Sequence, residues 1–149
     1  ERCYDNEVIG FNMRMTDIHA AIGRVQLGKL SAWTAQRQQN AKFLDTHLEG
    51  VTTPPVSSGA VHVYHQYTIR VADDRDGFAA ELGRRGVGTG VYYPVPLHLQ
   101  DCFLPLGGRE GDFPHAEKAA REVLALPMFA ELTGPEIERV AEALVESLD

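Results

Sequence analysis

The sequence has few cysteines, little positive charge and no long hydrophobic run, and each shortage excludes a class of protein. Its 149 residues contain two cysteines, Cys3 and Cys102, which are far apart and outside any CxxC motif. Such sparse thiols fit a reducing cytoplasm and predict free side chains rather than a disulfide framework. No stretch approaches the roughly 18 consecutive apolar residues of a membrane-spanning helix, and residues 1–12 lack the pattern of a signal peptide. We therefore expect a cytoplasmic protein.

The shortage of basic residues argues against two kinds of partner. Fourteen Lys and Arg stand against 21 Asp and Glu, which leaves a formal net charge of −7. Proteins that bind nucleic acid or anionic lipid present basic patches, and this chain has no polybasic segment. The sequence thus predicts no nucleic-acid partner and no membrane partner. With 44% hydrophobic and 23% charged residues, its composition is that of a folded globular chain.

Several chemical motifs are also missing. The sequence contains neither a P-loop nor a G-x-S-x-G nucleophile elbow. The glycines at 86–90 lead from an expected helix into an expected strand, the reverse of the order in dinucleotide-binding folds. Two of the six histidines, His62 and His65, are three apart on an expected strand and therefore point to opposite faces. The sequence predicts no metal site.

The pattern of apolar residues predicts one long helix over 16–49, followed by elements in the order β-α-β-α-α. Thr16 and Asp17 suit the start of the long helix, and Gly50 suits its end. At 1.5 Å per residue this helix would measure about 50 Å, which favours a link between two bodies or a position across an interface. The other expected elements are strands at 61–71 and 87–93, helices at 75–85 and 113–124, and a last helix that begins at the T-x-x-E capping box of 133–136.

Two segments are candidates for ligand binding. Asn12 and Arg14 lie two apart just before the long helix, where a planar guanidinium and an amide could clamp an anion, although spacing alone favours an ordinary loop. The segment Y-Y-P-V-P-L-H, which contains Tyr93 and His98, is held extended by its two prolines. Its aromatic rings and imidazole suit a sugar or a base, but a purely structural loop fits the pattern equally well.

Three blocks of the sequence together resemble one family. They are G-F-N-M-R-M-T-D-I-H-A-A-I-G at 10–23, V-Y-Y-P-V-P-L-H-L-Q at 91–100 and G-D-F-P-H-A-E-K-A-A-R-E-V-L-A-L-P-M at 111–128. They resemble stretches of the DegT/DnrJ-type sugar aminotransferases and appear in that family's order over nearly the whole chain. Met13 and His19 depart from the family's usual aromatic residue and glutamine.

The resemblance implies an α/β fold, in which the chain holds a long inter-domain helix and then the small α+β C-terminal domain of the aspartate-aminotransferase-like fold type I, with a small antiparallel sheet packed with helices. It also implies pyridoxal phosphate as cofactor, a nucleotide-linked keto sugar as substrate and an amino donor, usually glutamate. Members of the family are homodimers with active sites at the subunit interface.

Individual residues carry over from the family only where they match its motifs. Asn12 is similar to the asparagine that reaches the partner subunit's cofactor phosphate, and Arg14 matches the arginine that follows it, near the cofactor or the sugar nucleotide. Tyr93 and His98 match the loop that lines the sugar-nucleotide site. The resemblance assigns no catalytic residue to this chain, because the family's cofactor-binding lysine lies upstream of the segment that contains Asn12.

The absent lysine leaves two functions open. In the first, the chain is the C-terminal part of a sugar aminotransferase, with residues 1–50 as the end of the large domain and the inter-domain helix, and 51–149 as the small domain. This part would be inactive alone and would form a homodimer or pair with the missing N-terminal part. In the second, the chain is a non-catalytic module that binds a nucleotide sugar or mediates dimerisation.

Overall fold

The computed structural model describes residues 13–148 and divides the chain into two compact units, residues 1–31 and residues 32–149. Helix α1 (Asp17–His47) begins in the first unit and ends in the second. This confirms the long helix that the apolar pattern predicts.

In the first unit, α1 begins at the predicted cap. The Thr16 hydroxyl accepts a hydrogen bond from the His19 amide at 3.2 Å, and the Thr16 carbonyl accepts one from the Ala20 amide at 2.9 Å. Asp17 places a negative charge in the first turn, where it complements the helix dipole. Among the described residues of this unit, the large apolar side chains are nonetheless exposed, by between 53% and 82%: Met13, Met15, Ile18, Ile22, Val25, Leu27 and Leu30.

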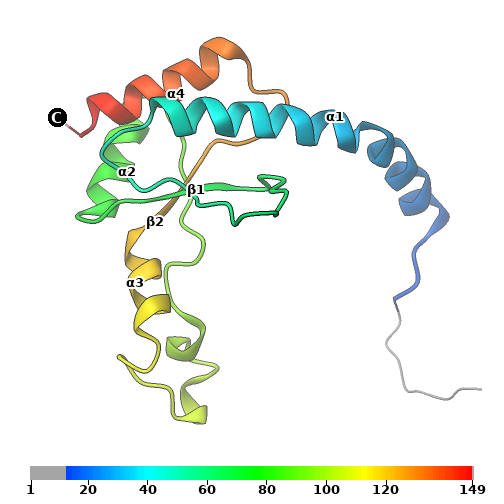
Figure 1. Ribbon diagram of the computed structural model, residues 1–149. Helices are drawn as coiled ribbons and strands as arrows, with labels where there is room; N and C mark the ends of the chain where they lie inside the picture. The colour runs from blue at the N-terminus through cyan, green and yellow to red at the C-terminus, as the bar shows by residue number, and fades with distance from the viewer. Residues whose placement is uncertain (1–12, 149) are drawn as a thin grey trace, which may run out of the picture. The chain divides into compact units, whose positions relative to one another are not determined.

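The second unit is built on a two-stranded antiparallel sheet (Figure 1). Strand β1 (Tyr67–Arg70) pairs with β2 (Val123–Leu126), so that Tyr67 faces Leu126 and Arg70 faces Val123. Isolated bridges extend the pairing on both sides, because Thr52 bonds to Arg70 and Gly90 bonds to Ala125. The strand β2 therefore lies between β1 and the segment around Gly90.

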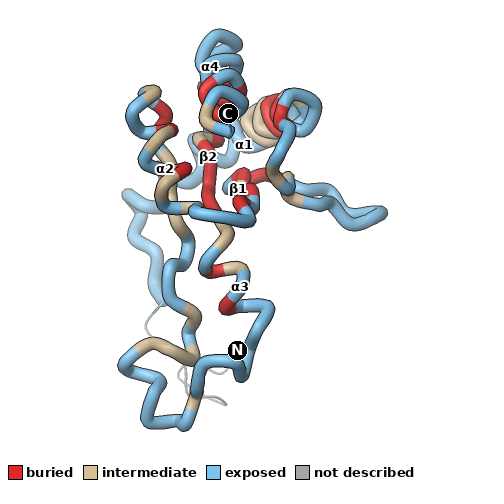
Figure 2. Tube along the Cα trace, turned by 90° about the vertical axis from the view of Figure 1, so that its left-hand side faces the viewer, coloured by how far each residue is buried: buried red, intermediate tan, exposed pale blue. Residues whose placement is uncertain are grey.

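Helices and 3₁₀ turns complete this unit. They are α2 (Arg75–Arg84), η1 (Leu97–Leu99), η2 (Leu104–Leu106), α3 (Pro114–Glu122) and α4 (Gly134–Glu146). Figure 2 shows that burial is concentrated on the strands, α4 and the nearby part of α1, while the segment before α3 is mostly exposed. The core is apolar, and its fully buried larger side chains are Leu44, Tyr67, Ile69, Leu82, Leu124 and Leu144.

Of the two predicted strands, one is much shorter than predicted and the other does not form. In the 61–71 segment only Tyr67–Arg70 forms a strand, because Tyr64 has a left-handed φ of +47° and its amide donates to His62 Nδ1 at 2.9 Å. The 87–93 segment is not a strand; it makes only the bridge between Gly90 and Ala125. A strand extends only as far as its partner does, and β2 has four residues.

The predicted helix over 113–124 is wrong at its C-terminal end. Helix α3 ends at Glu122, and Val123 and Leu124 belong to β2, which the sequence pattern did not predict. The hydrogen bonds to β1 decide this boundary, since a short apolar run fits a buried strand as well as a helix. The predicted capping box of α4 is confirmed: the amide and hydroxyl of Thr133 both donate to Glu136, at 2.8 and 2.7 Å.

Candidate ligand groove

A groove of about 530 Å³ separates the proline-rich segment 92–100 from helix α3. We call it the α3 groove. One wall comes from Tyr92, Tyr93, Val95, Pro96, Leu97 and Gln100, and the other from Ala116, Ala119, Ala120 and Val123. The structure thus brings the predicted aromatic–proline segment onto a helix that begins 14 residues further along the sequence.

The segment wall keeps its shape through local contacts. The Leu99 amide donates to the Pro96 carbonyl at 3.0 Å, and Gln100 Nε2 donates to the Val95 carbonyl at 3.2 Å. Tyr93 stands out from this wall with 78% of its surface exposed. The expectation that two prolines hold this segment extended is wrong over most of its length, because the chain bends at Tyr92, Pro94 and Val95 and then forms the 3₁₀ turn η1.

Alanines make up the part of the second wall that comes from α3. Ala119 and Ala120 follow Ala116 by three and four positions, so they share its face of α3, and Val123 of β2 completes the wall. Alanine leaves room between the two walls, where a larger side chain at these positions would fill the groove.

The chemistry of the α3 groove suits an uncharged, ring-shaped group. None of its lining residues carries a charge, and its polar groups are two tyrosine hydroxyls and one glutamine amide. Aromatic rings stack on sugars and bases while their hydroxyls form directional hydrogen bonds. A phosphate bound next to this groove would need cations from elsewhere.

His98 joins the two walls but does not line the groove. Its Nε2 lies 2.9 Å from Oε1 of Glu117, and these side chains are only 12% and 6% exposed. The same carboxylate accepts hydrogen bonds from the Gly111 amide at 2.9 Å and the Phe113 amide at 3.2 Å. Glu117 therefore connects the proline-rich segment, the turn before α3 and α3 itself.

The environment of Glu117 keeps it ionised. Burial opposes the charged form, but hydrogen bonds from the amides of Phe113 and Gly111 and from His98 outweigh it and lower the pKa of Glu117. The carboxylate also lies in the first turn of α3, where the helix dipole favours negative charge. At neutral pH Glu117 is an anion that can only accept hydrogen bonds.

Of the two predicted cofactor residues, only Arg14 lies in the described part of the chain, and it does not line this groove. Asn12 lies outside the described residues, and Arg14 is an exposed residue in the first unit. As a donor set, a guanidinium and an amide fit the phosphate of pyridoxal phosphate. The three lysines are weaker candidates for holding the cofactor. Lys29 and Lys42 lie on α1. Lys118 lies on α3, pairs with Glu122 at 3.6 Å and does not line the groove.

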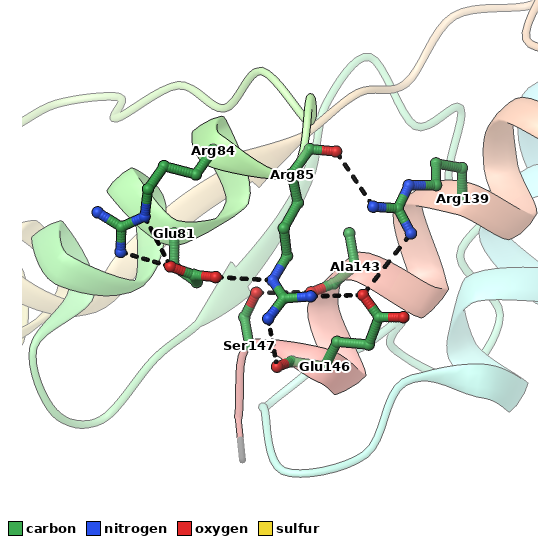
Figure 3. Close-up of polar contacts among 7 residues, drawn as sticks. All are labelled: Glu81, Arg84, Arg85, Arg139, Ala143, Glu146 and Ser147. Atoms are coloured by element: carbon green, nitrogen blue, oxygen red, sulfur yellow. Dashed lines mark hydrogen bonds and ion pairs between the residues drawn. The ribbon is translucent and has the colours of Figure 1, made fainter.

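The Arg84–Arg85 doublet belongs to a separate polar cluster (Figure 3). Arg85 connects α2 to α4, since it pairs with Glu81 at 2.8 Å and with Glu146 at 2.5 Å. Arg84 also pairs with Glu81, and Arg139 donates to the Arg85 carbonyl at 3.3 Å. Each cation has a carboxylate partner, so this cluster ties two helices together.

Other absences concern only the described part of the chain. Within residues 13–148, no three His, Cys, Asp or Glu side chains gather closely enough to hold a metal ion. No helix in the same range is both long and apolar enough to cross a membrane. Cys102 is a free, exposed thiol, and Cys3 lies outside the described residues.

Sequence reasoning named Tyr93 and His98 but missed Glu117. The Glu stands in the quoted F-P-H-A-E block, in the first turn of an expected helix that begins with Pro114, and a carboxylate there commonly accepts backbone amides. That position could have marked Glu117 as a buried acceptor. Its partner His98 is 19 residues away, and only the fold brings the two together.

The chain matches known proteins over nearly its whole length. The sequence profile of the DegT/DnrJ/EryC1/StrS aminotransferase family matches residues 1–145. A "pleiotropic regulatory protein" of Geobacillus stearothermophilus is 45% identical over 148 residues, which cover 96% of this chain and 40% of that protein. The dTDP-3-amino-3,4,6-trideoxy-alpha-D-glucose transaminase of Streptomyces venezuelae is 34% identical over 146 residues, which cover 96% and 38%.

Solved structures agree with these matches. The crystal structure of S. venezuelae DesV in complex with a ketimine intermediate superposes with a TM-score of 0.89 at 33% identity, and covers 97% of this chain and 40% of that one. NtdA from Bacillus subtilis with bound cofactor PMP gives 0.84 at 32% identity, with 98% and 36% covered. The chain thus spans about 40% of the length of the curated relatives it matches.

Proposed function

This chain belongs to the DegT/DnrJ/EryC1/StrS aminotransferase family, and we propose that it forms the C-terminal part of a pyridoxal-phosphate-dependent aminotransferase acting on a nucleotide-linked keto sugar. The observation that carries the proposal is the α3 groove. It is uncharged, lined by two tyrosines, and formed by two of the three sequence blocks that carry the family resemblance. Relatives that match the chain include a transaminase named for a dTDP-linked amino sugar.

In this proposal the α3 groove takes the uncharged part of the nucleotide sugar. Tyr93 stacks on a ring of the ligand and donates its hydroxyl, and the segment that contains His98 forms the wall that carries it. Because the groove supplies no cation, the diphosphate relies on residues outside it. The amino donor that we expect is glutamate, as is usual for the family.

Asn12 and Arg14 are the residues of this chain that we assign to the cofactor phosphate. Arg14 offers a permanently charged, planar set of donors, and Asn12 offers an amide two residues away. When bound, pyridoxal phosphate supplies the electron sink that makes amino transfer possible. No lysine of this chain matches a family motif, so the covalent attachment of the cofactor falls to a part of the enzyme outside it.

We propose that the first unit packs against the rest of the enzyme, and that the complete enzyme is a homodimer. Seven large apolar side chains among its described residues are more exposed than a soluble surface usually tolerates in one stretch. Residues 1–50 are accordingly assigned to the end of the large domain and the inter-domain helix, and residues 51–149 to the small domain.

One observation favours the non-catalytic alternative. Every residue of the buried apolar core lies between Ala41 and Leu144, inside the second unit. A unit with its own core could fold and bind a nucleotide sugar without the rest of an enzyme. A monomeric chain that unfolds cooperatively would favour this alternative, whereas association through the first unit favours the aminotransferase.

Titration of the full chain with dTDP-glucose, followed by ¹H–¹³C methyl spectra, tests the proposal. We expect shifts at the groove methyls of Val95, Leu97 and Ala116, and none with glucose alone. Tyr93→Ala should weaken binding about tenfold or more, because stacking on an aromatic ring contributes roughly 1–3 kcal/mol.

Leu106→Ala is the matched control, since Leu106 is 83% exposed on the same loop and does not line the groove. Its affinity should equal that of the wild type. Binding that Tyr93→Ala leaves unchanged, or shifts that fall outside the groove, would contradict the assignment.

A further inference from the structure

We propose that Glu117 is a positioning residue which, through His98, sets the spacing between the two walls of the α3 groove. The inference rests on the proposed function only in taking the groove as the nucleotide-sugar site. It assigns to the His98–Glu117 pair the task of holding Tyr93 at the correct distance from α3.

His98 and Glu117 connect the two walls of the α3 groove without lining it. His98 comes from η1, next to the wall residue Leu97, and Glu117 comes from α3, next to the wall residue Ala116. The 2.9 Å contact between them is therefore a direct polar link between the two walls. Among the described residues, Glu117 is one of two buried polar or charged side chains.

Backbone amides of the turn before α3 also hold Glu117 in place. Both of its oxygens accept from the Gly111 amide, at 2.9 and 3.0 Å, and Oε1 also accepts from the Phe113 amide. Gly111 has a φ of +93°, a backbone conformation that glycine adopts without strain. The turn that leads into α3 thus aims two donors at the carboxylate and limits its movement.

His98 is enclosed in the same way. Its ring packs against Phe113 with centroids 4.8 Å apart. Behind it, a β-carbon at Gly108 would lie 2.5 Å from the His98 carbonyl oxygen, so this close approach needs glycine. Close neighbours surround both the backbone and the side chain of His98. This suits a residue that keeps one position and supports the wall, rather than a group that moves when a ligand binds.

The hydrogen bond also determines the tautomer of His98. An ionised carboxylate accepts hydrogen bonds and donates none, so the proton of the neutral imidazole must reside on Nε2. This donor is committed to Glu117. Ligand contacts are left to the exposed Tyr93, and His98 acts through the position of the wall that carries it.

The ligand-free test compares variants of the full chain by methyl spectra and amide exchange. His98→Leu removes the donor, while His98→Gln keeps an amide donor near the position of Nε2. We expect His98→Leu to shift the methyl signals of Leu97, Val95 and Ala116, and His98→Gln to restore them. Glu117→Gln should accelerate amide exchange at Gly111 and Phe113 about tenfold, because hydrogen bonds to a charged acceptor are the stronger ones.

The matched control is Glu136→Gln. Like Glu117, Glu136 lies in the first turn of a helix, and its carboxylate accepts a hydrogen bond from a backbone amide. It does not line the α3 groove. Its replacement should leave the groove methyls and the exchange at Gly111 and Phe113 unchanged. If Glu117→Gln and Glu136→Gln change the groove methyl signals and the amide exchange equally, the effect is a general loss of stability, and the proposal is overturned.

Two further measurements complete the test. A long-range ¹H–¹⁵N spectrum of the wild type should show the Nε2–H tautomer of His98; the Nδ1–H tautomer would overturn the proposal even if His98→Leu fails to fold. With dTDP-glucose, His98→Leu should weaken binding about tenfold and His98→Gln less than threefold, taking a hydrogen bond to a charged group as the guide. If the wild type does not bind dTDP-glucose, the proposed function fails, while the methyl, exchange and tautomer data still decide the role of Glu117.

Discussion

The two halves of helix α1 have similar apolar residues, but only the second half buries them. In the first unit Ile18 and Leu27 are 73% and 67% exposed, whereas Ala41 and Leu44 in the second unit are fully buried. Isolated helices in water gain little stability from propensity alone, so most of it comes from packing of an apolar face. One continuous helix thus packs into a core of this chain at one end and, we propose, against another part of an enzyme at the other.

Polar contacts also hold the second half of α1. Asn40 is buried and donates to the Phe129 carbonyl at 3.3 Å, and Arg37 donates to the carbonyls of Tyr64 and Met128, each at 3.3 Å. These bonds anchor the second half of α1 to segments that are distant in sequence. The second half is thus held by both apolar and polar groups.

The largest expected effect comes from shortening one leucine in each half. Leu44→Ala should lower the free energy of unfolding by about 2–5 kcal/mol, because it opens a cavity in a closed core. Leu27→Ala, the matched change in the exposed half, should alter it by no more than about 0.5 kcal/mol. Urea unfolding measures both. Equal losses would mean that the two halves do not differ as described.

Acid should weaken the second unit. Hydrogen bonds from Arg84 and Arg85 lower the pKa of Glu81, those from Thr133 lower the pKa of Glu136, and the pKa of Glu117 is lowered as described above. A group whose folded pKa is depressed stabilises the fold above its unfolded pKa, about 4.3 for Glu. This stabilisation is lost as the pH falls through the depressed folded values.

We therefore expect the free energy of unfolding to be level above about pH 5 and to fall below about pH 4.3. Thermal unfolding at a series of pH values measures this. Glu136→Gln should reduce the slope in acid, because the neutral amide has no proton to take up. An unchanged slope would show that the capping box does not contribute.

The smallest effect is expected at the start of α1. Thr16→Ala removes the hydroxyl that accepts from the His19 amide, and a lost N-cap costs about 0.5–2 kcal/mol of local helix stability. The loss should appear as faster amide exchange over the first turns, with the urea midpoint of the core unchanged. Thr46→Ala is the control, because Thr46 bonds back to the Phe43 carbonyl near the other end of the helix. A shift of the midpoint in Thr16→Ala would mean that the two halves unfold together.

The confirmed predictions are those that depend on neighbouring residues. Thr16 and Asp17 begin α1, and the Thr133–Glu136 box begins α4, because each uses contacts within four positions of the chain. The strand at 61–71 was overextended and β2 was missed, because the length of a strand depends on a partner more than 50 residues away. Tyr93 and His98 were named from a motif, and they stay predictions as ligand-site residues.

The starts of the helices, the apolar positions and the family to which the chain belongs can be read from the residues alone, since they follow from local hydrogen bonding, side-chain chemistry and residue order. The folded chain was needed to show that β2 is a strand, that Glu117 meets His98, and that segment 92–100 and α3 enclose a groove. Each of these depends on contacts between residues far apart in the chain. Such contacts form only when burial of the apolar core offsets the entropy of closing the loops between them.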